Sequence, residues 1–123
     1  MSIVRTALVA AAIVAPALAA HAATPRLTDV QYIAASRCIG LMESKALGPV
    51  DDYALKARLR DEGAGRVSSV WDMADQARNE AASAASRASG YDKARLISER
   101  DSVCVALMPP TQTTAAPNTT HAE

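Results

Sequence analysis

Apolar side chains recur at steps of three and four residues from Arg26 to Met108. This spacing is typical of amphipathic helices, in which residues one turn apart share a face. The sequence therefore predicts an all-α domain over residues 24–108. We expect a small antiparallel three- or four-helix bundle, linked by one disulfide and preceded by a signal peptide.

The first predicted helix covers about residues 29–43. Thr28 can cap its first turn, and Gln31 at the third helical position can reach back to it, which is the pattern of a capping box. The apolar face is expected to consist of Val30, Ile33, Ala34, Cys38, Leu41 and Met42.

The second predicted helix is shorter, at about residues 51–62, and ends before the glycines at 63 and 65. Two pairs of opposite charge are spaced four residues apart on it, so they are expected to pair on the solvent-facing side. These pairs are Asp52 with Lys56 and Arg58 with Glu62.

The third predicted helix is the longest, at about residues 66–89, and its apolar seam changes character along its length. Large residues such as Val67, Val70 and Trp71 come first, and small ones follow at Ala74, Ala77, Ala81, Ala84, Ala85 and Ala88. We interpret the alanine half as a part of the core that buries little apolar area per residue. The alternative is a partner surface formed by Trp71, Ala77, Ala81, Ala84 and Ala88. A buried Trp71 is the default expectation, whereas an exposed one would indicate a binding hot spot.

The apolar spacing slips at Gly90, because Leu96, Ile97, Val103, Cys104, Leu107 and Met108 do not continue the heptad phase. A break at Gly90, with Asp92 capping a fourth helix, explains the slip. One long helix with a stutter is the alternative.

The first 23 residues read as a secretory signal peptide. Arg5 supplies a positive charge, residues 6–14 form a short apolar run, and cleavage is expected near Ala22 or Ala23. A membrane span would need about 20 apolar residues, and Pro16 interrupts this shorter run. We therefore expect a periplasmic or secreted product without stable membrane insertion. Residues 109–123 are rich in Thr, Ala and Pro and predict a disordered tail.

Cys38 and Cys104 are the two cysteines of the chain, and each lies on the apolar face of its predicted helix. In an exported protein two cysteines most simply form one disulfide. A cross-link between the first and last helices is expected to contribute about 4 kcal/mol to stability. Two free buried thiols are the alternative.

The inventory of side chains excludes most catalytic and cofactor chemistry. The chain has 13 basic and 13 acidic residues and no net charge, which argues against nucleic-acid binding. Its histidines, His21 and His121, both lie outside the predicted helices, so no His-based triad or zinc site is expected. The carboxylate pair Asp72 and Asp75 is read as a solvated surface. We predict a non-enzymatic protein with no catalytic residue, no metal and no cofactor.

Residues 27–31, Leu-Thr-Asp-Val-Gln, resemble the Leu-Thr-x-x-Gln motif of small helical periplasmic chaperones of the stress-response type. Those proteins typically have the motif twice, whereas here it occurs once, so no family is identified from it. The function predicted from these observations is non-enzymatic protein binding, chaperone-like, in envelope stress. The alternative is a dedicated inhibitor or immunity-type module with one protein partner, the oligomeric state being open.

Overall fold

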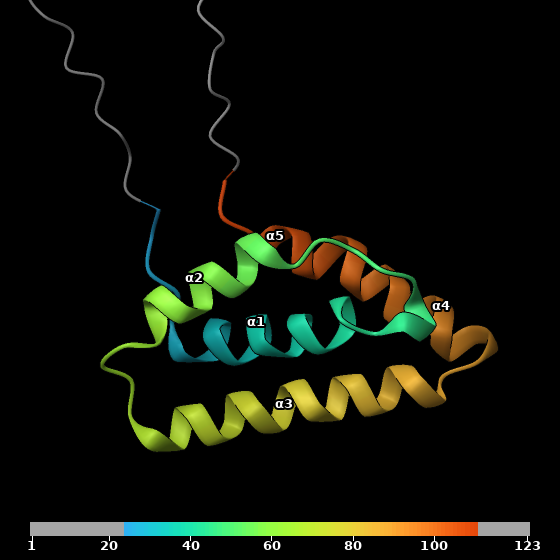
Figure 1. The fold of residues 1–123 in the computed structure, drawn as a ribbon, viewed down its shortest axis with the longest axis horizontal. Coiled ribbons are helices and arrows are strands. Elements are labelled where there is room, and N and C mark those ends of the chain that lie inside the picture. Colours follow the sequence, from blue (N-terminus) through green and yellow to red (C-terminus); the bar gives the residue numbers. More distant parts are fainter. Residues whose placement is uncertain (1–23, 111–123) are drawn as a thin grey trace, which may run out of the picture.

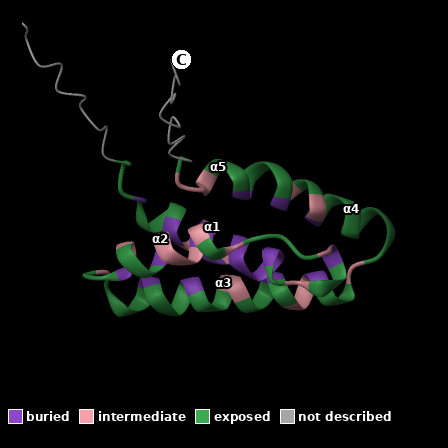
Figure 2. Ribbon diagram, turned by 45° about the horizontal axis from the view of Figure 1, so that its top comes forward, coloured by how far each residue is buried: buried purple, intermediate pink, exposed green. Residues whose placement is uncertain are grey.

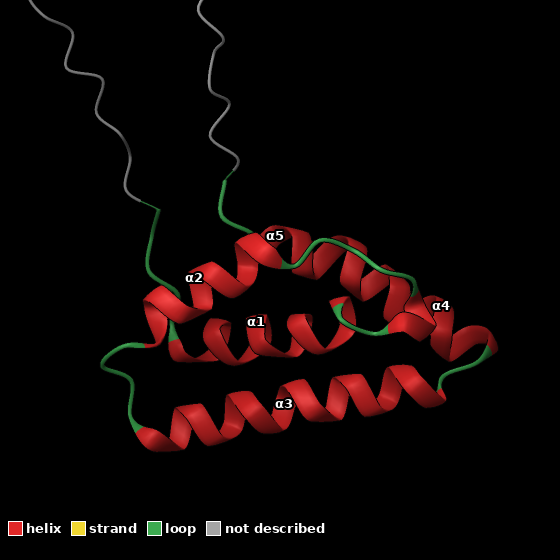
Figure 3. Cartoon of the chain, in the orientation of Figure 1, coloured by secondary structure: helices red, strands yellow, loops and turns green. Residues whose placement is uncertain are grey.

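A computed structural model describes residues 24–110 of the chain. The predicted signal peptide and all but the first two residues of the predicted tail lie outside the described residues. The described part is built from helices and contains no strand (Figure 3). The elements are α1 (Asp29–Met42), the 3₁₀ turn η1 (Lys45–Leu47), α2 (Tyr53–Gly63), α3 (Ser68–Arg87), α4 (Gly90–Glu99), the π-helical turn η2 (Arg100–Cys104) and α5 (Val105–Leu107). The prediction of a helical fold is confirmed.

Helix α1 is the centre of the fold. The capping box predicted at its start is present, since the Thr28 hydroxyl accepts from the Gln31 N–H and the Gln31 side chain accepts from the Thr28 N–H. The apolar face predicted for α1 was too narrow, because the helix contacts α2, α3 and η2 on different sides. Val30, expected inside, is 77% exposed, whereas Tyr32, Ala35 and Ile39 are buried.

The closest packing in the molecule is between α1 and α3. These two helices lie side by side and run in the same direction (Figure 1), because α2, which comes between them in the sequence, runs back in the opposite direction. Gly40 on α1 allows the close approach. A Cβ built on it would lie 2.2 Å from the backbone oxygen of Arg78 and 3.0 Å from the Cβ of Ala81.

The small buried side chains of α3 also allow α1 and α3 to pack closely. Val70, Ala74, Ala81 and Ala85 are its buried residues, and they form the purple stripe of α3 in Figure 2. Val67, expected in the same seam, precedes the first turn and is exposed. The alanine seam is therefore part of the core.

The chain breaks between α3 and α4, as the slip in apolar spacing predicted. Helix α3 ends at Arg87 and α4 begins at Gly90, which has a positive φ of 53°. The cap, however, differs from the expectation. Ser89 occupies the N-cap position without a side-chain hydrogen bond, and Asp92 lies inside the first turn of α4. There its negative charge interacts favourably with the positive end of the helix dipole.

Helix α4, η2 and α5 continue into one another without leaving helical backbone angles. Their buried residues Leu96, Arg100 and Cys104 follow at steps of four. In an α-helix each such step overshoots the buried face by about 40°. The π-helical turn winds more loosely, so it returns Cys104 to the face that meets α1.

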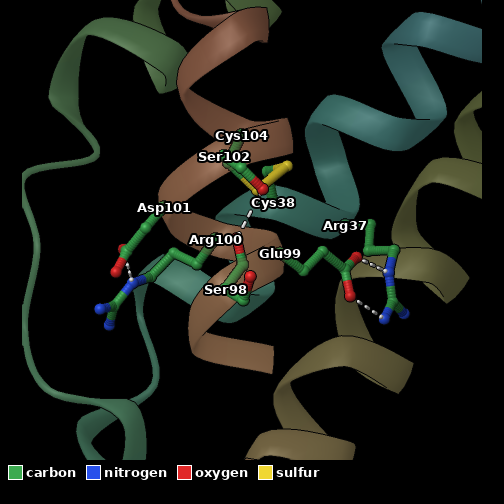
Figure 4. The surroundings of a disulfide bond; sticks show 8 residues. All are labelled: Arg37, Cys38, Ser98, Glu99, Arg100, Asp101, Ser102 and Cys104. Atoms are coloured by element: carbon green, nitrogen blue, oxygen red, sulfur yellow. Dashed lines mark hydrogen bonds and ion pairs between the residues drawn. A yellow bond between two sulfur atoms is a disulfide. The ribbon is translucent and has the colours of Figure 1, made fainter. Parts of the chain in front are cut away.

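That return allows the disulfide between Cys38 and Cys104 (Figure 4). Their Cα atoms are 5.4 Å apart and their positions are separated by 66 residues. The predicted pairing is confirmed, and the alternative of two free thiols is wrong. Beside the disulfide, Arg37 on α1 donates two hydrogen bonds to the Glu99 carboxylate, at 2.7 and 3.1 Å (Figure 4).

Both ends of the described chain meet at one side chain of α2. The Arg58 guanidinium donates to the backbone oxygen of Pro25 at 2.8 Å and to that of Leu107 at 3.0 Å. It also pairs with Glu62, as the spacing predicted. Thr24 and Pro110 accordingly line the same hollow beside Arg58.

Candidate functional site

A groove of about 350 Å³ lies between α2 and α3, with α1 as its floor. Its floor residues are Tyr32, Ser36 and Ile39, its α2 wall is Lys56, Leu59 and Arg60, and its α3 wall is Trp71, Ala74, Asp75 and Arg78. The volume lies in the range of small-ligand and side-chain pockets, about 300–1,000 Å³. The groove arises because α1 and α3 pack tightly at their alanines while α2 contacts mainly α1.

Two hydroxyl groups of the floor have no hydrogen-bond partner among the described residues. Tyr32 is 4% exposed and Ser36 is 7% exposed, so both side chains are more than nine-tenths buried. Every fully buried side-chain nitrogen and oxygen of the described chain is hydrogen-bonded. The two unpartnered oxygens therefore keep some exposed surface, and both residues line the groove. They offer two hydroxyl donors and acceptors to an occupant.

The Tyr32 hydroxyl remains protonated at neutral pH. Burial raises its pKa above the ordinary value of 10.0, although the charge of Arg66 lowers it. The Arg66 guanidinium carbon lies 4.4 Å from the centre of the Tyr32 ring, a cation–π distance. This contact helps to hold the ring in place.

Trp71 forms the aromatic end of the groove. Its ring centre lies 6.0 Å from that of Tyr32, and the two planes meet at 70° in an edge-to-face contact. Gly63 at the end of α2 makes room for the indole, since a Cβ there would lie 2.7 Å from the indole carbon Cη2. The indole is thus held at one edge and open to the groove at another.

Trp71 is 42% exposed, so the default expectation of a buried tryptophan is wrong. The indole lies against Gly63 at the end of α2, and part of its surface remains uncovered. Of the other residues of the proposed partner surface, Ala81 is buried against α1 and Ala77, Ala84 and Ala88 are half-buried. Trp71 is therefore more exposed than these four alanines.

A carboxylate from the chain itself closes the opposite end of the groove. Glu43, at the end of α1, lies 2.7 Å from the Lys56 ammonium on α2 and 2.7 Å from the Arg78 guanidinium on α3. Burial raises the pKa of Glu43, but the hydrogen bonds from Lys56 and Arg78 outweigh it and lower the pKa below 4.5. Asp52 also pairs with Lys56, as its spacing predicted.

Two further charges line the groove without a partner among the described residues. Arg60 lies one turn beyond Lys56 on the same side of α2, and Asp75 lies one turn beyond Trp71 on α3. Because α2 runs opposite to α3 (Figure 1), Arg60 lies towards the Trp71 end. Asp72, which sequence spacing placed with Asp75, does not line the groove.

The described residues form no metal centre. Among residues 24–110, no three His, Cys, Asp or Glu side chains are placed to hold an ion. Within the same range no helix has both the length and the apolar character required to span a bilayer.

Comparisons with protein-family models, with curated proteins and with solved structures found no match to this chain. The function must therefore be inferred from the groove itself.

Sequence reasoning found Trp71 and missed the rest of the groove. Tyr32, Ser36 and Arg60 come from two helices whose relative placement no local pattern encodes. One signal was present, since Ser36 is a polar residue between the buried Ala35 and the disulfide-forming Cys38. A polar side chain at a core position without a local partner often faces a ligand or water.

Proposed function

We propose that this protein is a non-enzymatic binding module that accepts a segment of a partner protein in the groove between α2 and α3. The observation that carries the proposal is the combination of a half-exposed indole with two unpartnered hydroxyls on one floor. An apolar side chain of the segment would pack on Trp71 and Leu59. Its backbone amides would satisfy Tyr32 and Ser36. Binding hot spots commonly have this form, an aromatic anchor in a small pocket.

The groove favours a dedicated partner over broad chaperone activity. A protein that holds many clients needs a wide, adaptable apolar surface. Here the alanine seam is packed against α1, and the other exposed apolar residues are scattered, including Tyr53 on α2 and Tyr91 on α4. The inhibitor or immunity-type alternative is thus the better supported of the two predicted functions. The Cys38–Cys104 disulfide supports action outside the cytoplasm.

The proposal is tested with the indole of Trp71, which is the only tryptophan of the chain. The full chain is immobilised, proteins of the exported fraction are captured, and each is purified and titrated into the isotope-labelled chain. A true partner shifts the single indole N–H resonance at one-to-one stoichiometry. Trp71→Ala should weaken binding by at least about tenfold, the scale of a hot-spot residue.

Met73→Ala is the matched control, because Met73 is exposed on the same helix and does not line the groove. Equal weakening by both variants would contradict a groove-centred interface. Suppressed aggregation of several unrelated clients, independent of Trp71, would instead establish the chaperone alternative.

A further inference from the structure

Basic side chains outnumber acidic ones in the lining of the groove. The chain has equal numbers of basic and acidic residues. The groove, in contrast, is lined by three cations, Lys56, Arg60 and Arg78, and by one acid, Asp75. Glu43 and Asp52 balance Lys56 and Arg78, so Arg60 is the cation of the groove that remains to attract an acidic group and to fix its register.

Glu43 indicates which group these cations accept. Its carboxylate bridges Lys56 and Arg78 and thereby connects the two walls of the groove. Two of the three cations are therefore already neutralised by the chain itself. Arg60 lies one turn away, beside the aromatic end, and no carboxylate of the described residues pairs with it. Glu43 thus already supplies a carboxylate to Lys56 and Arg78, whereas Arg60 can still accept one from a partner.

We infer that the partner segment is acidic, with an Asp or Glu that pairs with Arg60 and an adjacent aromatic or aliphatic side chain that packs on Trp71. This inference rests on the proposed function, since it specifies the occupant of the same groove. The distance between the two recognition elements is short, because Arg60 and Trp71 both line one end of the groove. Neighbouring residues of an extended segment point to opposite sides, so the acidic and apolar side chains can reach the α2 and α3 walls separately.

Asp75 limits where the partner's acid can lie. Its carboxylate, one turn from Trp71 on α3, repels a second carboxylate on its own wall and leaves the α2 wall as the favourable side. Asp75 is also an acceptor that fits a backbone N–H of the segment. Neutralising Asp75 should consequently improve binding of acidic segments, whereas neutralising Arg60 should weaken it.

The experiment is a selection of random short peptides displayed on phage against the immobilised full chain. Enriched peptides are synthesised and titrated while the Trp71 indole resonance is followed. We expect them to contain an acidic residue beside an aromatic or aliphatic one. Arg60→Gln should weaken their binding about tenfold, as for a lost hydrogen bond to a charged group. Asp75→Asn should tighten binding about threefold, the scale of one exposed charge pair.

Each variant has a matched control that changes the same charge elsewhere. Arg87→Gln and Asp72→Asn alter exposed charges of α3 outside the groove and should leave the affinities unchanged. Thermal unfolding of all four variants verifies that each is folded. Arg60 forms no hydrogen bond or ion pair within residues 24–110, so its replacement is not expected to disturb the fold.

The outcomes separate this inference from the proposed function. Peptides that shift the indole resonance but are basic or uncharged, or that bind Arg60→Gln as tightly as the unmodified chain, would overturn the acidic segment alone. If no enriched peptide shifts the resonance, the groove is not a peptide-binding site, and the proposed function fails with the inference.

Discussion

The α-carbon of Gly40 faces the backbone carbonyl of Arg78 with no space for a side chain between them. This contact sets the distance between α1 and α3, and the alanines of α3 extend it along the helix. The groove depends on the same contact, because Arg78 belongs both to this contact and to the α3 wall.

Gly40→Ala is therefore expected to separate the two helices. The added methyl group would overlap backbone atoms, which cannot rotate away, so the cost should reach about 3 kcal/mol, the upper part of the range for overpacking. Urea unfolding measures the change. Ala82→Val adds methyl groups to the exposed side of α3 and should change stability by less than about 0.5 kcal/mol. A Gly40→Ala variant as stable as this control would refute the close contact.

Reduction of the Cys38–Cys104 disulfide is expected to lower the free energy of unfolding by about 4 kcal/mol, as for a closed loop of this size. Domains of this length typically have only about 5 kcal/mol or somewhat more in total. The melting temperature should thus fall steeply in the presence of reductant. The double variant Cys38→Ser with Cys104→Ser, which reductant cannot affect, should melt where the reduced protein melts. An unchanged melting temperature on reduction would contradict the prediction.

Arg100 is expected to stabilise the connection after α1. Its guanidinium is buried and donates to the backbone oxygens of Leu47 at 2.8 Å and of Gly48 at 3.0 Å. Arg100→Gln removes both hydrogen bonds, and the free energy of unfolding should fall by about 2 kcal/mol. Arg95→Gln, an exposed change on α4, is the control. If both variants unfold at the same urea concentration, the guanidinium does not hold this loop.

Stability is expected to decrease in acid because of Glu62. Burial raises the pKa of this carboxyl group, but the hydrogen bonds from the Arg58 side chain and the Leu27 N–H lower it below 4.5 overall. A carboxyl group with a lowered pKa stabilises the fold above its unfolded pKa, and that stability is lost as pH falls through the folded pKa.

Glu62→Gln should accordingly be less stable than the unmodified protein at neutral pH and should show a shallower decline below about pH 4.3, the pKa of an unfolded glutamate. Thermal unfolding across the acid range measures both effects. Glu80→Gln, which changes an exposed carboxylate of α3, should keep the original slope. Identical slopes for all three proteins would show that Glu62 does not control the acid transition.

The sequence predicts the helices well because their signals are local. The capping box of Thr28 and Gln31, the ion pairs of α2 and the break at Gly90 each depend on residues within a few positions. The disulfide was predictable because the chain has two cysteines, both on apolar faces.

The groove was not predictable, because it depends on how helices are placed relative to one another. Gly40 reads as an ordinary glycine in a helix until α3 lies against it. The close contact between α1 and α3 has no local signature. Trp71 is the exception, because a lone tryptophan can be singled out from the sequence as a candidate binding residue. The apolar periodicity nevertheless predicted that it is buried, whereas it is partly exposed.

Arg58 binds the backbone on both sides of the described domain, at Pro25 and at Leu107. The chain consequently enters and leaves the helical body at nearly the same point. A domain with adjoining ends can be inserted into a surface loop of another protein without stretching either. The groove could thus be transplanted as a single cassette, with its recognition surface intact on a host of choice.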